Sequence, residues 1–200
     1  MRTTPTDAEI VAQSRADPDM FAAIFERHVI PIHTYLVRRA GRDTADDLLS
    51  EVFRVAFEVR GRFRQDRASA LLWLYGIAAN VLRQSWRAQH RQNRVTNRLS
   101  SLPLQPSDFD NEPEEVLSRN EDVSLAVRAL NPLPPADRET LLLYAWEDLT
   151  YAETSEVLDI PVGTVRARLS RARSRVREHL AASGEVVGNI QRRTDRGYRS

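Results

Sequence analysis

Apolar residues recur every three or four positions along most of the chain, which is the spacing that one face of an α-helix requires. Near the C-terminus this spacing gives a seam at positions i, i+4, i+7 and i+11, made of Val165, Leu169, Ala172 and Val176. No stretch alternates apolar and polar residues as a half-buried β-strand would. We therefore expect an all-α fold.

The chain is expected to fold as two helical parts, because its apolar periodicity stops in the middle. Pro103, Pro106 and Pro113 stand there among Ser, Asp, Asn and Glu residues, a composition typical of a linker. Glycines and scattered arginines after the second part indicate a mobile end. The predicted divisions are two small helical domains over residues 1–98 and 123–182, a flexible acidic linker over 99–122 and a mobile tail over 183–200.

Composition excludes several classes of function. The chain has no cysteine, so disulfides, thiol nucleophiles and cysteine metal sites are ruled out. Its four histidines are scattered, and no glycine-rich phosphate loop or order of carboxylate, histidine and nucleophile is visible. No run of about 18 apolar residues could cross a membrane, and the N-terminus lacks the apolar core of a signal peptide. We expect a cytoplasmic protein that is not an enzyme and that uses no cofactor, no metal and no membrane.

Charge is distributed unevenly along the chain. All 29 basic residues are arginine. Two arginine-rich blocks, over 60–98 and 160–200, flank an acidic block over 108–122, although the net charge is only +1. Two separate basic blocks suggest two places that hold a polyanion. For either block alone, a solvated helix face is the preferred explanation.

Two helices are expected before residue 60. Asp17 can cap the first, which should run to about Arg39 with a kink or break at Pro31. Asp43 or Thr44 can cap the second, and the carboxylates in its first turn would be favoured by the helix dipole.

The outer face of the second helix carries a charged stripe, made of Asp47, Glu51, Arg54 and Glu58. Such charges often form only intrahelical pairs, each worth about 0.2–0.5 kcal/mol. The remaining circumference is apolar and includes Leu48 and Val55, which is wider than one domain needs. A protein partner on this helix is the other interpretation, and both stay open.

A third helix is expected from about Ser69 to Arg91, with one apolar and one polar face. Arginines and amides beside aromatic rings suit single-stranded or melted nucleic acid, because guanidinium groups neutralise phosphates while rings stack on bases. Trp73, taken alone, is more often a core residue, and the arginines could merely solubilise the face. The predicted contacts are Arg64, Trp73, Asn80, Arg83, Gln84 and Arg87.

The most specific pattern lies near the C-terminus. Thr150 and Glu153 form a capping box that opens a short helix. Residues 159–161 (Asp-Ile-Pro) then make a tight corner before a final helix. A capped helix, a three-residue turn and a second helix predict a helix-turn-helix, in preference to an arginine-rich surface helix.

On the exposed face of the final helix, small residues lie between two rims of arginine. Such a face can settle into a major groove, where the rims hold phosphates and residues near the N-terminal end reach base edges. The predicted contacts are Thr164, Arg166, Ala167, Arg168, Ser170, Arg171 and Arg173.

Several of these stretches resemble segments of one protein family, the extracytoplasmic-function (ECF) RNA polymerase sigma factors, a two-domain branch of the sigma-70 family. The likeness spans about residues 20–180 and is carried by 21–39 with 46–53, by 73–80, and by 133–135, 151–153 and 161–173. The last of these segments is the most specific.

The resemblance implies a DNA-binding subunit that directs core RNA polymerase to promoters and helps to open them. The second helix would bind the clamp helices of the polymerase, the third would melt and capture the −10 element, and the final helix would read the −35 element. Contact with the flap of the large polymerase subunits and control by an anti-sigma factor are implied as well. The residues so assigned to core polymerase binding are Asp46, Asp47, Leu48, Ser50, Glu51 and Arg54.

The sequence departs from the family pattern at four places. Ser50 stands where glutamine is usual, and residues 154–155 (Thr-Ser) replace a more apolar pair. Asp159 stands where glycine is common, although aspartate tolerates the left-handed backbone region better than most residues. Ala167 lacks a hydroxyl that many relatives have, so this chain should have its own promoter specificity.

A stand-alone helix-turn-helix transcriptional regulator is the alternative function. A regulator would not need a basic, amide-bearing third helix, and it should bind duplex DNA tightly without core polymerase. The acidic linker is equally consistent with threading a polymerase channel and with simple solubilisation.

Overall fold

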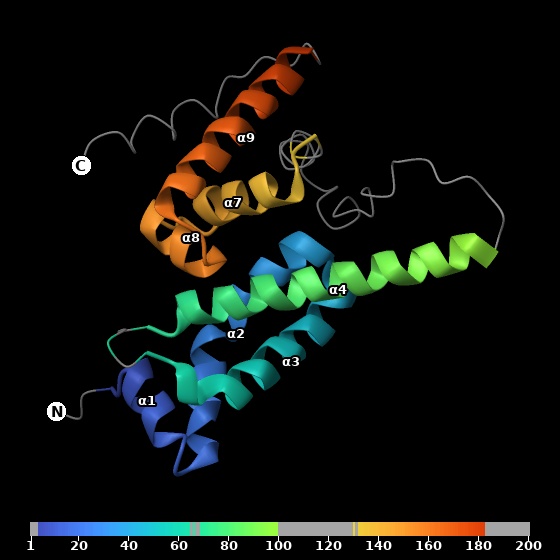
Figure 1. Cartoon of the computed structure of the whole chain (residues 1–200). Coiled ribbons are helices and arrows are strands. Elements are labelled where there is room, and N and C mark those ends of the chain that lie inside the picture. The colour runs from blue at the N-terminus through green and yellow to red at the C-terminus, as the bar shows by residue number, and fades with distance from the viewer. Residues whose placement is uncertain (1–3, 65, 67–68, 100–129, 131, 183–200) are drawn as a thin grey trace. The chain divides into compact units, whose positions relative to one another are not determined.

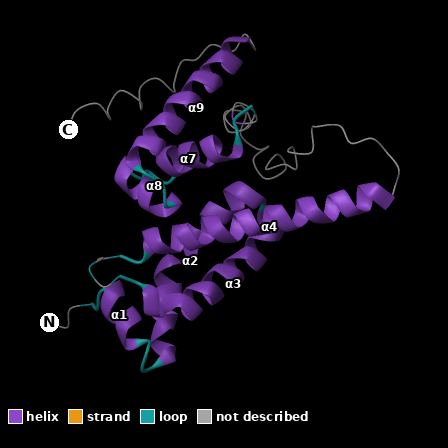
Figure 2. Cartoon of the chain, viewed as in Figure 1, coloured by secondary structure: helices purple, strands orange, loops and turns teal. Residues whose placement is uncertain are grey.

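The computed structural model of the chain describes residues 4–64, 66, 69–99, 130 and 132–182. All regular structure in these residues is helical (Figure 1, Figure 2), which confirms the all-α prediction. None of the described helices is long and apolar enough to span a bilayer. The predicted acidic linker, apart from Leu99, and the predicted tail lie outside the described residues.

The chain divides into two compact units, the first containing the helices up to α4 and the second containing α7 and α9. The helices are α1 (Asp7–Gln13), η1 (Pro18–Phe21), α2 (Ala22–Ala40), α3 (Arg42–Val59), η2 (Arg60–Arg62), α4 (Leu71–Leu99), α7 (Pro135–Trp146), α8 (Tyr151–Leu158) and α9 (Val162–Ala182).

The core of the first unit lies between α2, α3 and α4, which all contact one another (Figure 1). Ile24, Leu36, Val52 and Leu74 are completely buried there. Each such side chain contributes about 1.5–3 kcal/mol through removal of its apolar surface from water. The shared core therefore fixes which faces of α3 and α4 remain exposed.

α2 continues through Pro31, so the helix is not broken there as the sequence allowed. Proline cannot donate the hydrogen bond that this position would give to the preceding turn. Ile24 and Ile32, both fully buried, anchor the segments before and after Pro31 in the same core. Tertiary packing thus outweighs the missing bond.

α2 ends and α3 begins at Gly41, whose φ of 76° lies in a region that glycine adopts without strain. Its N–H donates to the Val37 carbonyl at 3.0 Å, and its carbonyl accepts from the Ala45 N–H at 3.1 Å. α3 therefore starts at Arg42, and the predicted cap by Asp43 or Thr44 is wrong, because both residues already lie inside the first turn.

α1 is a helix that the sequence patterns did not predict. A capping box starts it: the Thr6 N–H donates to Glu9 Oε2 at 2.7 Å, and the Glu9 N–H donates to Thr6 Oγ1 at 3.3 Å. α4 is also longer than expected, continuing to Leu99 beyond the predicted end at Arg91.

The second unit packs α9 against α7, with Leu143, Val165, Leu169 and Ala172 buried. The predicted capping box is confirmed, since the Thr150 N–H donates to Glu153 Oε2 at 2.7 Å and the Glu153 N–H to Thr150 Oγ1 at 3.2 Å. Three residues join α8 to α9. The first of them, Asp159, has a φ of 53°, the left-handed conformation expected from the sequence.

Candidate nucleic-acid interface

The polar face of α4 is exposed. Its exposed side chains are Asn80, Arg83, Gln84, Arg87 and Arg91. Arg83 Nη2 donates to Asn80 Oδ1, and Arg83 Nε donates to the Ala79 carbonyl at 3.2 Å, so this guanidinium lies along the helix. The helix contains no acidic residue. The face therefore carries arginines and amides without a carboxylate, and it can hold a phosphate backbone.

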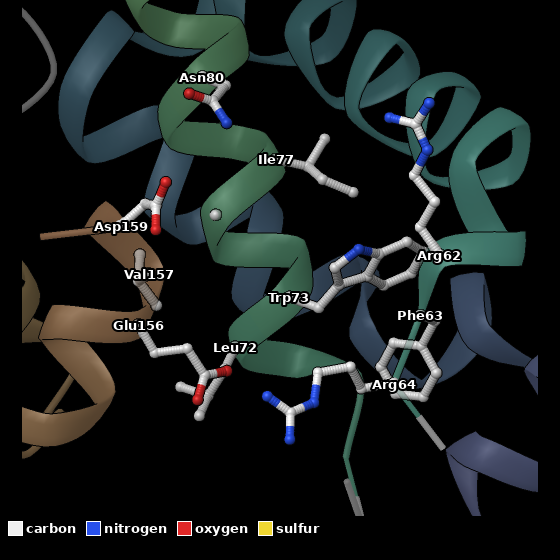
Figure 3. Close-up of a pocket in the computed structure, with 11 residues that line it drawn as sticks. Arg62, Phe63, Arg64, Leu72, Trp73, Ile77, Asn80, Glu156, Val157 and Asp159 are labelled. Atoms are coloured by element: carbon white, nitrogen blue, oxygen red, sulfur yellow. The ribbon is translucent and has the colours of Figure 1, made fainter. Parts of the chain in front are cut away.

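Two aromatic rings lie at the N-terminal end of this face. Phe63 and Trp73 have ring centroids 5.1 Å apart with planes inclined at 60°. Phe63 is buried and Trp73 is half-buried, so the tryptophan ring retains surface for a ligand. Figure 3 shows both rings next to one another, with Arg62 and Arg64 close by. Basic groups around an aromatic platform are the elements that single-stranded nucleic acid requires.

Arg64 has a partner in its own segment. Its Nη2 lies 2.6 Å from Asp66 Oδ2 and its Nε lies 3.2 Å from Asp66 Oδ1. The hydrogen bonds and the charge of Asp66 raise the pKa of Arg64 above its usual value. Both side chains are exposed, so solvent screens the pair. A phosphate could displace the carboxylate and take the guanidinium.

The outer face of α3 carries the intrahelical pairs that its charged stripe allowed. Arg54 Nε and Nη2 donate to both carboxylate oxygens of Glu51 at 2.7 and 2.6 Å, and Arg54 Nη1 donates to Glu58. The hydrogen bonds from Arg54 hold the pKa of Glu51 below its usual value. Asp47 is exposed on the same face, and no hydrogen bond or ion pair is recorded for it in the described part of the chain.

The other residues assigned to a polymerase contact are placed differently. Asp46 pairs with His33 of α2, with Oδ1 and Nε2 3.0 Å apart. The Ser50 hydroxyl donates back to the Asp46 carbonyl at 3.1 Å. Leu48 is only 7% exposed, so its side chain belongs to the core of the unit rather than to its surface. Only part of the predicted set can therefore touch a partner directly.

The face of α9 that the sequence assigned to DNA remains available at its N-terminal half. Arg166, Ala167 and Ser170 are exposed, while Thr164 and Arg168 are half-buried. The two small residues leave a shallow strip between the arginines, as close approach to base edges requires.

Two arginines of α9 also hold the second unit together. Arg171 Nε and Nη2 lie 3.2 and 3.0 Å from the two carboxylate oxygens of Asp137, which is buried in the first turn of α7. Hydrogen bonding and attraction by Asp137 raise the pKa of Arg171. The guanidinium carbon of Arg173 lies 5.3 Å from the centre of the Tyr144 ring of α7, a cation–π geometry. The sequence patterns missed Asp137 and Tyr144, although an acid after Pro134-Pro135 is a first-turn signal.

The described residues contain no group of three or more His, Cys, Asp or Glu side chains that could hold a metal ion.

Comparison with known families gives two matches, one before and one after residue 100. Residues 24–92 match the family described as Sigma-70 region 2, and residues 125–176 match the family described as Sigma-70, region 4. The first match contains α3 and most of α4, and the second contains α7, α8 and most of α9.

Similar whole proteins are found as well. The ECF RNA polymerase sigma-E factor of Haemophilus influenzae is 28% identical over 182 residues, which cover 88% of this chain and 95% of that protein. Two solved structures share the fold. The structure of CnrH in complex with the cytosolic domain of CnrY is 20% identical, with a TM-score of 0.60, and covers 88% of this chain and 97% of that one. The sigma factor RpoE of Bartonella quintana, solved with the anti-sigma factor NepR, is 19% identical, with a TM-score of 0.52, and covers 82% and 96%.

Proposed function

The chain belongs to the sigma-70 family as an ECF-type RNA polymerase sigma factor, and we propose that α3, α4 and α9 perform separate parts of promoter recognition. α3 docks on core polymerase, α4 captures an opened strand of the −10 element, and α9 reads the duplex −35 element. The observation that carries this division is chemical: the two basic faces differ, one bearing aromatic and amide groups and the other small residues.

The face of α9 suits duplex DNA. Ala167 and Ser170 allow the helix backbone to approach the major groove, where Arg166 can reach the O6 and N7 acceptors of a guanine. Arg168 lies on the rim and suits a phosphate. The second unit therefore reads sequence through few side chains.

The face of α4 suits a strand whose bases are unpaired. Trp73 offers a stacking surface, Asn80 can donate and accept at a base edge, and the arginines that follow can track the backbone. A duplex would not expose the base faces that a ring needs for stacking. The first unit therefore stabilises the opened state of the promoter.

The partners follow from these roles. Core RNA polymerase would bind the first unit through its clamp helices and the second through the flap of its large subunits, and promoter DNA would bind both. The Bartonella quintana relative was solved with an anti-sigma factor, and we propose control of this chain by a protein of that kind. The sigma factor itself catalyses no reaction and acts in the cytoplasm, where core polymerase works.

The stand-alone regulator is not favoured, because its single DNA-reading domain would leave the matched Sigma-70 region 2 without a role.

Run-off transcription with purified core polymerase on a promoter library tests the proposal. Wild-type chain should start RNA synthesis from a subset of templates that share two elements, and core polymerase alone should not. A gel shift supplies the second arm: the free chain should bind duplex promoter weakly and the holoenzyme tightly. Tight binding by the free chain, together with no transcription, would favour the regulator.

A further inference from the structure

α1 lies before the segment that matches Sigma-70 region 2, yet it carries a buried carboxylate that joins three parts of the first unit. Asp7 Oδ1 lies 2.9 Å from Arg27 Nη1, and Asp7 Oδ2 lies 2.7 Å from His28 Nε2. The backbone N–H of Ala70 also donates to Asp7 Oδ2, at 2.8 Å. Asp7 is 5% exposed, so these partners take the place of water.

The Asp7 carboxyl is held in its ionised form. Burial raises its pKa, but the hydrogen bonds from the Ala70 N–H, Arg27 and His28 outweigh burial and leave the pKa below its usual value of 3.8. A carboxylate at this place also meets the N-terminus of α4, because the Ala70 carbonyl accepts the first helical hydrogen bond, from the Leu74 N–H at 2.9 Å. The helix dipole favours negative charge there.

The residues just after α1 make a second contact within the first unit, with residues 60–61. Arg15, just after α1, donates from Nη2 to the Gly61 carbonyl at 2.9 Å. Arg60 returns a bond from Nε to the Ser14 carbonyl at 3.3 Å. The α1 region thus contacts the chain at Gly61 through Arg15 and at Ala70 through Asp7.

The side chains that open the proposed strand-binding face lie next to these two points in the sequence. Arg62, Phe63 and Arg64 follow Gly61, and Trp73 stands in the first turn after Ala70. The Phe63–Trp73 ring contact joins the two sides of the segment. Movement of either end would separate the rings and shift the arginines beside them.

We propose that Asp7 is a positioning residue for promoter opening: together with Arg15 it fixes Gly61 and Ala70, so that Phe63 and Trp73 meet a separated strand in one arrangement. This role rests on the proposed capture of the −10 strand by α4. Asp7 itself touches no DNA and no polymerase.

The test compares holoenzymes on a promoter selected by the wild-type chain, with opening followed by permanganate reactivity of unpaired thymines. Asp7→Asn keeps an oxygen for the Ala70 N–H but removes the charge, and Arg15→Ala releases the other end through an exposed side chain. Each should lower the opening rate about five- to tenfold, as expected when one charge-assisted hydrogen bond is lost. Affinity for core polymerase and for a duplex carrying only the −35 element should stay within about twofold of wild type.

Glu9→Gln is the matched control, because it weakens the capping box of the same helix while the bonds to Gly61 and Ala70 stay in place. It should open the promoter at close to the wild-type rate. If Glu9→Gln lowers opening as much as Asp7→Asn, the effect is a general loss of α1, and the positioning role is overturned. If Asp7→Asn fails to fold, the opening rate of Arg15→Ala alone tests the positioning role.

A second pair of variants separates this inference from the function on which it rests. Asn80→Ala and Arg83→Ala should each slow opening if α4 captures the strand. If they do so while Asp7→Asn and Arg15→Ala open normally, the positioning role is wrong and strand capture stands. If none of the four slows opening, strand capture by α4 has failed.

Discussion

At the scale of single residues, Arg171 shows that a side chain on a helix proposed to face DNA can belong to the fold. From the sequence, Arg171 is a candidate for a base contact, because it lies near the N-terminal end of the final helix. In the structure, Nε and Nη2 of Arg171 instead donate to the two carboxylate oxygens of Asp137 in α7. Two parallel N–H groups of this kind are what a bidentate contact with guanine needs, and here Asp137 already occupies them.

Arg171→Ala should therefore destabilise the second unit, since it leaves the buried Asp137 carboxylate without its partner. We expect Tm to fall by an amount on the order of a few degrees. Arg166→Ala, on the same helix but outside the pair with Asp137, should leave Tm unchanged and should lose affinity mainly at one −35 base pair, by about 1–3 kcal/mol. Circular dichroism melts and a binding series over single-base −35 variants measure both. If Arg171→Ala keeps the wild-type Tm and loses affinity at only one base pair, Arg171 is a base contact after all.

Asp7 gives the stability of the first unit a defined pH dependence. Because its pKa is lower in the folded chain than the usual 3.8, the folded state binds fewer protons than the unfolded state at acid pH. The stabilisation is fully present above pH 3.8 and is lost as pH falls through the lower, folded pKa. The difference in Tm between wild type and Asp7→Asn should thus be constant from pH 6 to about 5 and should shrink below 3.8. A difference that instead shrinks above pH 5 would assign the stabilisation to another group.

The candidate residues on α9 and α4 were predictable because exposure follows from helical periodicity. What periodicity could not supply was the partner of each arginine. Asp137 precedes Arg171 by 34 positions, and Asp7 reaches Ala70 across 63. Only the packing of one helix on another brings such groups together, and no local pattern in the sequence encodes that distance.

At the scale of elements, local signals were reliable where the backbone itself makes the contact. The capping box at Thr150 and the left-handed Asp159 were both predicted, because each depends on residues within one turn. The break allowed at Pro31 does not occur, and the predicted side-chain cap at the start of α3 was wrong, for the opposite reason. Burial of Ile24 and Ile32 carries α2 past the proline, and Gly41 supplies a tighter junction than a capping side chain.

On the outer face of α3, the proposed docking of polymerase and the pairing within the helix involve different acidic residues. Asp47 is exposed and has no recorded partner among the described residues, whereas Glu51 is held by Arg54. Asp47→Asn should weaken binding to core polymerase about two- to fivefold, the range for one exposed charge pair, and the loss should diminish at high salt. Fluorescence titration of core polymerase at two salt concentrations measures this effect. Asp19→Asn, an exposed acid on η1, is the matched control, and an equal loss there would indicate a general charge effect rather than docking by α3.

At the scale of the whole molecule, two compact units with different basic faces imply two independent contacts with one promoter. Mutations at sites that share no partner add in free energy, whereas mutations within one network do not. The separation into two units therefore predicts how the effects of one mutation in each unit combine, and not only the size of each effect.

In holoenzyme, Arg83→Ala on α4 and Arg166→Ala on α9 should have additive effects on the free energy of open-complex formation, within about 0.5 kcal/mol. The reason is that one side chain would contact an opened strand and the other an intact duplex. Arg83→Ala with Asn80→Ala provides the comparison, because Arg83 Nη2 donates to Asn80 Oδ1, and this pair should depart from additivity. Open-complex equilibria measured for the four members of each cycle decide the question. A strong coupling between Arg83 and Arg166 would mean that the two units act on the same stretch of DNA, since a single shared contact is what makes two losses fail to add.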